Sequence, residues 1–344
     1  MISVDGQIGE GGGQILRTSL SLSLISGLPF SITNIRSGRD KPGLRPQHLN
    51  AVLLSKQISH ANVEGAEIGS TELVFLPQKV VSGIYQTNIG TAGATSLVLQ
   101  TIYLPLNFAS KPSKIVLDGG THVPFAPTYD WLANHWLKYI KMIGFEIHLE
   151  INSAGFYPQG GGKIFAKINP VKDLSGITIL DRGTLNRVRG ISAVANLNRN
   201  IAVRQREQVI RRLGTKVPLS EIRIKQLTSN FKGTSLILIC EFENSQWCYS
   251  ALGAPGKPAE KVADEVCDQI EKYIPEQAAF DEYLSDQLML PLSYANSISK
   301  FTTVRITEHQ RTNAEIIKAF MNTNIEIDGI TGSPGTIKII PNSK

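Results

Sequence analysis

The chain has 344 residues, of which 42% are hydrophobic and 19% charged, and it carries a net charge of +6. This balance excludes an intrinsically disordered chain, and no apolar run approaches the roughly 20 residues of a membrane-spanning helix. Met1–Asp5 lacks the basic and apolar regions of a signal peptide, and the three cysteines lack metal-binding or disulfide-framework spacing. We therefore expect a globular α/β protein of the cytoplasm without a membrane partner, and the charge weakly favours a polyanionic partner.

The predicted elements repeat in one order, namely strand, helix, strand, helix, strand and strand. The first copy contains, in chain order, Ile2–Val4, Gln14–Ile25, Phe30–Ile35, Pro46–Ser59, Ala61–Val63 and Glu72–Leu76. The second copy starts near Ile84 and continues with a helix from GTAGAT (90–95) to about Tyr103, then Lys114–Leu117, Tyr129–Ile143, Phe145–Glu150 and Lys163–Ile168. Gly144 is the expected left-handed stop of the longer helix in this copy.

The third copy is interrupted after its first strand, Ile177–Leu180, and resumes at a helix over Glu282–Leu292. Its remaining elements are Phe301–Ile306, Asn313–Met321, Ile325–Ile327 and Thr336–Ile339. The inserted segment has its own alternation, with Ile191–Ala195, a helix over Val203–Leu213, Ile222–Lys225, Ser235–Glu241 and a helix over Pro258–Tyr273. We therefore predict an α/β (α+β) fold, in which residues 1–180 and 277–344 form a large domain of three βαβαββ units and residues 181–276 form a smaller inserted α/β domain.

A glycine-rich turn, GQIGEGGGQILRTS over residues 6–19, separates the first strand from the first helix. Such a turn lets backbone N–H groups approach a phosphate at a helix N-terminus. Glu10 would repel that phosphate unless a divalent cation lies between them, whereas Arg17 could face it. The spacing fits neither a dinucleotide fingerprint nor a P-loop, and the alternative is a tight turn followed by a surface arginine.

A basic loop, SGRDKPGLRPQHL over residues 37–49, follows the second strand. Arg36, Arg39, Lys41 and Arg45 lie within ten residues, and prolines stiffen the loop between them. Arginine forms planar, bidentate contacts to phosphate oxygens, which favours recognition of an anionic end group. The alternative is a solubilising surface loop.

Two segments of the interrupted third copy also carry polar residues suited to chemistry. In DEYLSDQLMLPLS (281–293), Tyr283, Asp286 and Gln287 could stack on and hydrogen-bond a nucleoside, or the acids could be only helix caps. In FTTVRITEHQRTNAEII (301–317), we expect a strand to end at Thr307 and a helix to be capped by Thr312 or Asn313. His309 would then lie in the connection, where neighbouring arginines favour the neutral, nucleophilic imidazole; a structural histidine is the alternative.

Six segments occur in a characteristic order, namely GEGGGQILRTSLSLS, the loop ending LRPQHL, GGTHVPFAPTYDW, GFYPQGGG, YLSDQL and EHQRTN. In order and spacing they resemble the RNA 3′-terminal phosphate cyclases over essentially the entire chain. The resemblance implies three βαβαββ units and an inserted domain of thioredoxin-like topology. The insertion has no CxxC, so we expect no redox chemistry from it.

The resemblance also implies an ATP-dependent reaction in three steps. A histidine attacks the α-phosphate of ATP, AMP passes to the 3′-terminal phosphate of RNA, and the neighbouring 2′-hydroxyl displaces AMP to leave a 2′,3′-cyclic phosphodiester. His309 occupies the position of the nucleophile, and Glu10 that of a glutamate beside a divalent metal, magnesium or manganese. Cyclase-like relatives that serve ribosome assembly lack the histidine, so His309 indicates the catalytic branch.

The remaining positions follow from the same resemblance. Residues implied to bind phosphate or RNA are Arg17, Arg36, Arg39, Gln47 and His48. Residues implied to bind ATP are Gln100, Pro124, Tyr283, Leu284, Ser285, Asp286 and Gln287, with Pro124 against the adenine. The expected partners are ATP and RNA with a 3′-terminal phosphate, and a homodimer is compatible with the resemblance.

Two other interpretations stay open from the sequence. One is a non-catalytic RNA-binding or ribosome-assembly scaffold of the same fold, suggested by the basic charge and by four arginines in one predicted helix of the insertion, Arg204, Arg206, Arg211 and Arg212. The other is an enolpyruvyl transferase, because that architecture also repeats βαβαββ units. Its chemistry requires no nucleotide, so saturable ATP binding would count against it.

Overall fold

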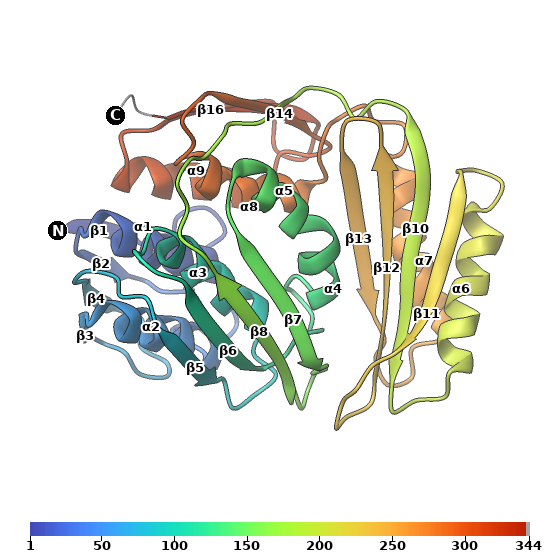
Figure 1. The fold of residues 1–344 in the computed structure, drawn as a ribbon, viewed down its shortest axis with the longest axis horizontal. Helices are drawn as coiled ribbons and strands as arrows, with labels where there is room; N and C mark the ends of the chain where they lie inside the picture. The colour runs from blue at the N-terminus through green and yellow to red at the C-terminus, as the bar shows by residue number, and fades with distance from the viewer. Residues whose placement is uncertain (342–344) are drawn as a thin grey trace.

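The computed structural model describes residues 1–341, in which three four-stranded sheets surround a group of helices and a fourth sheet belongs to an insertion (Figure 1). The first unit contains β1 (Ile2–Asp5), α1 (Gly13–Ser26), β2 (Phe30–Thr33), α2 (Pro46–Ser59), β3 (Asn62–Glu64) and β4 (Leu73–Leu76). The second contains β5 (Ile84–Asn88), α3 (Thr95–Asn107), β6 (Ser113–Gly119), α4 (Tyr129–Trp131), the π-helix η1 (Leu132–Trp136), α5 (Leu137–Ile143), β7 (Ile147–Ser153) and β8 (Gly162–Ile168). The third contains β9 (Thr178–Ile179), α8 (Glu282–Leu292), β14 (Ser299–Thr303), α9 (Glu308–Phe320), β15 (Asn324–Asp328) and β16 (Gly335–Ile340).

The three units share one strand order. Their sheets run β1-β2-β4-β3, β5-β6-β8-β7 and β9-β14-β16-β15. In each sheet the first two strands are parallel, as expected across a helical crossover, and the other two pairs are antiparallel. The predicted mixed α/β fold with three βαβαββ units is therefore confirmed.

Helix α1 is buried between the sheets along most of its length, because leucines alternate with small serines in its sequence. Leu20, Leu22 and Leu24 are all buried, and Ser21 is buried beside them. The hydroxyl of Ser21 donates to the carbonyl of Thr101 in α3 at 2.6 Å, so its small side chain satisfies its own polar group while the two helices pack closely. This packing fixes the N-terminal turn of α1 relative to α3 and α9.

The insertion lies between β9 and α8 and consists of β10 (Leu185–Ala195), α6 (Asn200–Leu213), β11 (Leu219–Gln226), β12 (Gly233–Phe242), β13 (Gln246–Leu252) and α7 (Ala259–Tyr273). Its strand order is β11-β10-β12-β13, with β10 and β11 parallel and the other pairs antiparallel. This arrangement agrees with the thioredoxin-like topology that the resemblance implied. We did not predict β13, which forms a hairpin with β12. The domain boundaries at residues 181 and 276 stay a prediction.

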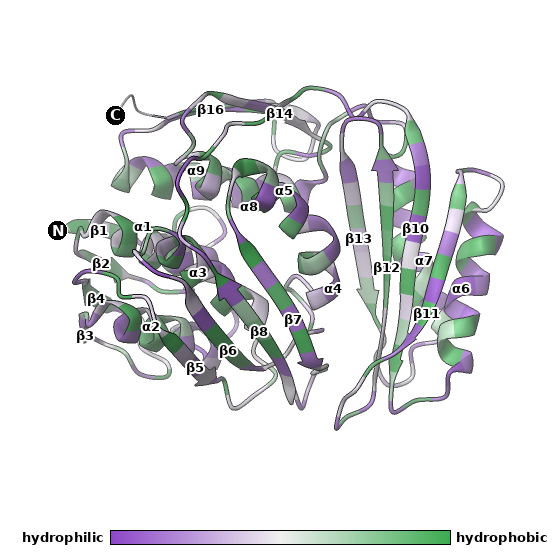
Figure 2. Cartoon of the chain, viewed as in Figure 1, coloured by the Kyte–Doolittle hydropathy of each residue, from purple (hydrophilic) through white to green (hydrophobic). Residues whose placement is uncertain are grey.

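The sheet of the insertion is covered on both faces. Val188, Leu236 and Leu238 pack on the side of α6 and α7, whereas Ile191 and Ile239 belong to the core shared with the three units. Figure 2 shows hydrophilic and hydrophobic positions intermixed along α6, as expected of a helix with one face on the sheet and the other exposed. Within residues 1–341, no helix combines the length and the apolar character needed to cross a membrane.

Candidate active site

His309 lies in the first turn of α9, not in a connection before the helix. Thr307 is the N-cap: its hydroxyl accepts from the Gln310 backbone N–H at 3.2 Å, and the Gln310 side chain accepts from the Thr307 N–H at 2.9 Å. The expectation that Thr312 or Asn313 caps this helix was therefore wrong. The Thr-x-x-Gln capping box, which is readable in the sequence, starts the helix earlier. His309 consequently stands where free backbone N–H groups and the helix dipole favour an anion.

Both ring nitrogens of His309 have polar partners from the glycine-rich segment. Nδ1 is hydrogen-bonded to Oε1 of Gln14, and Nε2 lies 3.0 Å from Oε2 of Glu10. The amide of Gln14 is oriented by Asp286, because its Nε2 donates to Asp286 Oδ1 at 2.8 Å. Since Oε1 of Gln14 can only accept, Nδ1 of His309 carries a hydrogen and Nε2 is the nitrogen available for chemistry.

Asp286 anchors this network from inside the protein. It is 7% exposed and also accepts hydrogen bonds from Asn313 at 3.3 Å and from Gln287 at 3.2 Å. Burial raises the pKa of Asp286, while nearby His309, the hydrogen bond from Gln14, the charge on Arg17 and the hydrogen bond from Asn313 act in the opposite direction. These four groups offset part of the cost of burial, and the pKa of Asp286 remains raised.

The glycine cluster allows charged side chains to lie against the backbone. Glu10 Oε1 is 3.1 Å from Nη2 of Arg39, and a Cβ at Gly12 would lie 2.5 Å from the same carboxylate oxygen. A Cβ at Gly13 would lie 2.2 Å from Nε2 of His48. The buried ring of His48 leaves no room for a side chain at Gly13, whereas a side chain at Gly12 would displace the ends of Glu10 and Arg39.

The arginines of the basic loop have different partners. Arg36 donates through Nη1 to the carbonyl oxygens of Lys41 and Gly43, at 2.7 and 3.0 Å, and so braces its own loop. Arg39 instead turns toward Glu10. Arg17, one turn into α1, has its pKa lowered to about 10 by burial, although Asp286 and Glu10 raise it. Its guanidinium therefore remains charged at neutral pH.

His48 and Gln47 join this loop to two helices. His48 is 4% exposed, and its pKa is lowered to about 3 by burial, with further contributions from Arg17, Arg36 and Arg45. It is therefore a neutral residue that packs against Gly13. Gln47 accepts a hydrogen bond from the backbone N–H of Ala94, the N-cap of α3, at 3.0 Å.

The predicted ATP-binding residues fall into two groups. Gln100 and Gln287 line a cavity of about 50 Å³ together with Gln14, Arg17 and Asp286. Within residues 1–341, Nε2 of Gln100 is buried without a hydrogen-bond partner, so this cavity holds an unused donor.

The other predicted ATP-binding residues lie outside this cavity. Leu284 and Ser285 are fully buried, and the Ser285 hydroxyl accepts from Nε2 of Gln310 at 2.6 Å, so these two residues support α9 from α8. Tyr283 is 54% exposed beside the insertion, near Tyr249. Pro124 is exposed in the loop after β6 and takes no part in the hydrogen-bonded network around His309.

A divalent cation fits this site only together with a phosphate ligand. Residues 1–341 contain no group of three or more histidine, cysteine, aspartate or glutamate side chains that could hold a metal. Glu10 offers one partly exposed carboxylate. Magnesium is typically held by one or two carboxylates, with water and substrate phosphates as its other ligands. The donor set therefore suits a cation that arrives with a nucleotide.

The sequence analysis did not select Gln14 or Asn313. Gln14 stands directly after the glycine cluster and one turn before Arg17, and that position was the available signal. Asn313 links two members of the network, since it donates to Asp286 and accepts from the Thr18 hydroxyl at 3.0 Å. Asn313, one of the two expected helix caps, is instead buried within α9.

Comparisons with known proteins identify relatives that span nearly the same length. A family model described as RNA 3′-terminal phosphate cyclase matches residues 8–327. The chain is 44% identical over 327 residues to the RNA 3′-terminal phosphate cyclase of Koribacter versatilis, with 95% of this chain and 92% of the relative covered. It is 38% identical over 329 residues to the protein of that name from Archaeoglobus fulgidus, with 96% and 98% covered. Among solved structures, an enolpyruvyl transferase from Streptomyces tendae aligns with 49% of this chain and 33% of that chain at 12% identity and a TM-score of 0.29, too low to support an argument.

Proposed function

This chain belongs to the RNA 3′-terminal phosphate cyclase family, and we propose that it cyclises the 3′-phosphate of RNA through a covalent adenylate on His309. It is an enzyme of the cyclase type. The observation that carries the proposed mechanism is the pair of contacts at the imidazole. Gln14 occupies Nδ1 and thereby leaves Nε2 as the nucleophilic atom.

In the first step, the Nε2 lone pair forms a bond to the α-phosphorus of ATP while the bond from that phosphorus to the bridging oxygen breaks. Pyrophosphate leaves with the electron pair. The hydrogen stays on Nδ1 and remains hydrogen-bonded to Gln14. The positive charge on the substituted ring is therefore stabilised through Gln14 by Asp286. Arg17 and the N-terminus of α9 stabilise the negative charge that develops on the phosphate oxygens.

Glu10 has to release Nε2 before that nitrogen can attack. The contact of 3.0 Å between Nε2 and Glu10 Oε2 is a hydrogen bond only while Nε2 carries a hydrogen, and a protonated nitrogen has no lone pair to donate. A divalent cation bound with ATP would supply charge neutralisation at the phosphates and would compete for the Glu10 carboxylate. Glu10 is thus both the partner of the imidazole before ATP binds and the candidate ligand of the divalent cation.

In the second step, an oxygen of the RNA 3′-phosphate attacks the phosphorus of the histidine adenylate, and Nε2 leaves. In the third, the 2′-hydroxyl attacks the RNA phosphorus, AMP leaves, the hydroxyl proton goes to solvent, and the cyclic phosphodiester remains. We assign ATP binding to Gln100, Pro124, Tyr283, Asp286 and Gln287. We assign the RNA terminal phosphate to the loop with Arg36, Arg39 and Gln47. Leu284, Ser285 and His48 are assigned supporting roles because they are buried.

The test is covalent labelling with ATP that carries a radioactive α-phosphate. We expect acid-labile, alkali-stable label on the wild type and none on His309→Ala. His148→Ala is the matched control, because His148 is also exposed and also lies beside a glutamate, at 2.8 Å from Glu150. RNA with a 3′-phosphate should become resistant to phosphatase in the presence of wild type and ATP. Absence of label from the wild type would refute the covalent mechanism.

The arginines of α6 suggested a non-catalytic RNA-binding scaffold, but two of them have acidic partners within the insertion. On α6, Arg204 pairs with Glu260 at 2.7 Å, and Arg212 contacts Asp264 and Glu271 of α7 at 3.2 and 2.5 Å. Two of the four arginines are therefore paired within the insertion. The cytoplasmic location and a homodimer stay predictions.

A further inference from the structure

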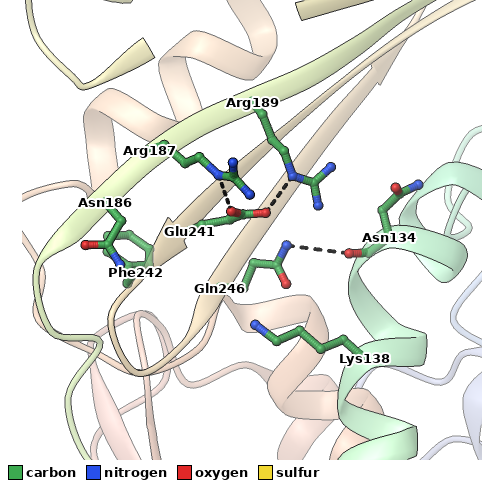
Figure 3. Close-up of a pocket in the computed structure, with 8 residues that line it drawn as sticks. All are labelled: Asn134, Lys138, Asn186, Arg187, Arg189, Glu241, Phe242 and Gln246. Atoms are coloured by element: carbon green, nitrogen blue, oxygen red, sulfur yellow. Dashed lines mark hydrogen bonds and ion pairs between the residues drawn. The ribbon is translucent and has the colours of Figure 1, made fainter. Parts of the chain in front are cut away.

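A second polar cleft lies between the three-unit body and the insertion, and none of the predicted site residues lines it (Figure 3). Its volume is about 500 Å³. Asn134 of η1 and Lys138 of α5 form one wall, while Arg187, Arg189 and Gln246 belong to the strands of the insertion opposite. Figure 3 shows Lys138 extending from its helix across the cleft toward those strands.

Strand alternation directs the basic side chains into this cleft. Val188 is fully buried on the side of α6 and α7, so its neighbours Arg187 and Arg189 face the opposite side, toward the three-unit body. Glu241 is the register partner of Arg187 on β12, and Gln246 is the register partner of Glu241 on β13. The hydrophilic positions on the upper part of β10 are visible in Figure 2.

One carboxylate holds both arginines without neutralising the cleft. Glu241 Oε2 is 2.5 Å from Nε of Arg187, and its Oε1 is 2.5 Å from Nε of Arg189. Both contacts use Nε, which leaves the two terminal nitrogens of each guanidinium for another acceptor. With Lys138, three positive side chains face one negative side chain, a surplus of two positive charges. An orienting carboxylate and free guanidinium edges suit phosphate oxygens.

Gln246 gives an independent indication of a ligand. The residue is 2% exposed, its Nε2 donates to the carbonyl of Asn134 at 3.5 Å, and its Oε1 has no hydrogen-bond partner within residues 1–341. A buried acceptor without a donor is unfavourable, so a ligand hydroxyl at this position would satisfy it. A phosphate cannot donate, whereas the 2′-hydroxyl of ribose can.

We propose that this cleft binds the sugar–phosphate backbone of an RNA strand, with phosphates on Arg187, Arg189 and Lys138 and a 2′-hydroxyl on Gln246. The strand is recognised through its backbone and not its bases, because Phe242, the aromatic residue of the cleft, is only 5% exposed and offers little surface for stacking. The same lack of a base pocket favours a strand over a free nucleotide. The site goes beyond the proposed function, which concerns only the reacting end.

The test uses a fluorescent single-stranded RNA of about 12 nucleotides that ends in a 3′-hydroxyl. Its binding is measured by fluorescence anisotropy at several salt concentrations, without ATP. This RNA cannot be cyclised, so the result is independent of whether His309 takes up AMP. We expect the double variant Arg187→Gln, Arg189→Gln to bind about tenfold more weakly. The slope of the logarithm of the binding constant against the logarithm of salt concentration should decrease in magnitude by about 1.4, or about 0.7 per lost phosphate contact. Unchanged affinity and salt dependence would overturn the proposal.

Two further variants separate a binding role from a structural one. Arg204→Gln is the matched control, because Arg204 is also an exposed arginine paired with a glutamate but lies on α6, and it should bind RNA as the wild type does. Glu241→Gln removes the one negative charge and should tighten binding severalfold. If Glu241→Gln lost as much RNA affinity as the arginine variant, the cluster would only support the fold, and the proposal would fail. Thermal unfolding checks that each variant is folded.

The ligand is distinguished by competition. DNA of the same sequence should bind more weakly than RNA, and Gln246→Met should reduce this preference because it removes the acceptor for the 2′-hydroxyl. AMP should displace the RNA only at concentrations far above those of an unlabelled RNA strand. Equal binding of RNA and DNA by the wild type, or displacement by AMP as efficient as by RNA, would overturn the assignment to an RNA backbone.

Discussion

Gln14, in the first turn of α1, accepts a hydrogen bond from Nδ1 of His309, in the first turn of α9. The same amide donates to Asp286, so its orientation is determined by a buried carboxyl group inside the protein. This relationship joins the glycine-rich segment to the histidine and decides which ring nitrogen is free. It is the basis of the first prediction.

Replacing Gln14 by alanine should lower the rate of self-adenylylation by about 10- to 100-fold, because the imidazole loses the group that sets its tautomer and orientation. Loss of the donor to Asp286 should also lower the free energy of unfolding by about 1–3 kcal/mol. Single-turnover labelling with α-labelled ATP measures the first effect and urea unfolding the second. Gln7→Ala, at an exposed glutamine of the same segment, is the control. A normal labelling rate in Gln14→Ala would show that the hydrogen bond is not used.

Glu10→Ala should mainly weaken metal-dependent adenylylation, because it removes a candidate ligand of the metal and leaves the nucleophile. We expect the metal concentration for half-maximal labelling to rise by about tenfold or more. Glu10→Gln retains the size of the side chain and loses most of its affinity for a cation, so it should behave like the alanine variant. A titration with magnesium or manganese tests this. If neither variant changes the metal requirement, Glu10 is not a ligand.

Arg39→Ala should impair transfer of AMP to RNA more than adenylylation of His309, if the basic loop holds the RNA terminal phosphate. The contact of Arg39 with Glu10 is partly exposed, so its loss should cost little stability. The two steps are measured separately, by label on the protein and by label transferred to RNA. Arg39→Lys, which keeps the charge but not the bidentate geometry, should fall between alanine and wild type. An equal loss in both steps would assign Arg39 to ATP.

Thr307→Ala should destabilise the protein by about 1 kcal/mol, because it removes the oxygen that caps the first turn of α9. His309 lies in that turn, so adenylylation should also slow. Thr307→Ser retains the hydroxyl and should restore both properties. Urea unfolding and labelling rates are compared for the three proteins. If alanine and serine behave alike, the cap does not hold the histidine.

His48 should make stability depend on pH below neutrality. Its pKa in the folded protein is lowered to about 3, so below about pH 6.5 the unfolded chain binds a proton that the folded protein does not. The contribution of His48 to the free energy of unfolding is therefore complete above about pH 6.5. Below that pH the free energy of unfolding falls by about 1.4 kcal/mol per pH unit, or about 2 kcal/mol by pH 5.

Urea unfolding at pH 7 and pH 5 tests this, with His48→Gln compared against the wild type. The variant should lose less stability between the two pH values, because it lacks the titrating group. His60→Asn replaces an exposed histidine of the same unit by a residue that tolerates its positive φ of 50°, and should retain the wild-type dependence. Identical pH dependence in all three proteins would contradict the assignment.

Local signals determined most of the secondary structure. Apolar spacing and stop residues predicted α2 and α8 with the observed bounds, and the repeated order of elements predicted the three sheets. Helix α9 starts earlier than predicted because the Thr307–Gln310 capping box satisfies its first turn. Strand β13 was not predicted, and it is held in the sheet by antiparallel pairing with β12.

The sequence by itself determined the repeated α/β architecture and the set of charged and nucleophilic side chains, because propensity, periodicity and capping act between residues close in the chain. Only the tertiary structure decided which of these meet. Gln14 and His309 are 295 residues apart, and their hydrogen bond depends on the packing of α1 against α9. The same holds for Arg204 and Arg212 of α6, which pair with acids of α7. It also holds for Arg187 and Arg189 of β10, which line the cleft. Contacts between distant segments depend on how buried faces pack against one another, and the pattern within one segment does not determine which faces meet.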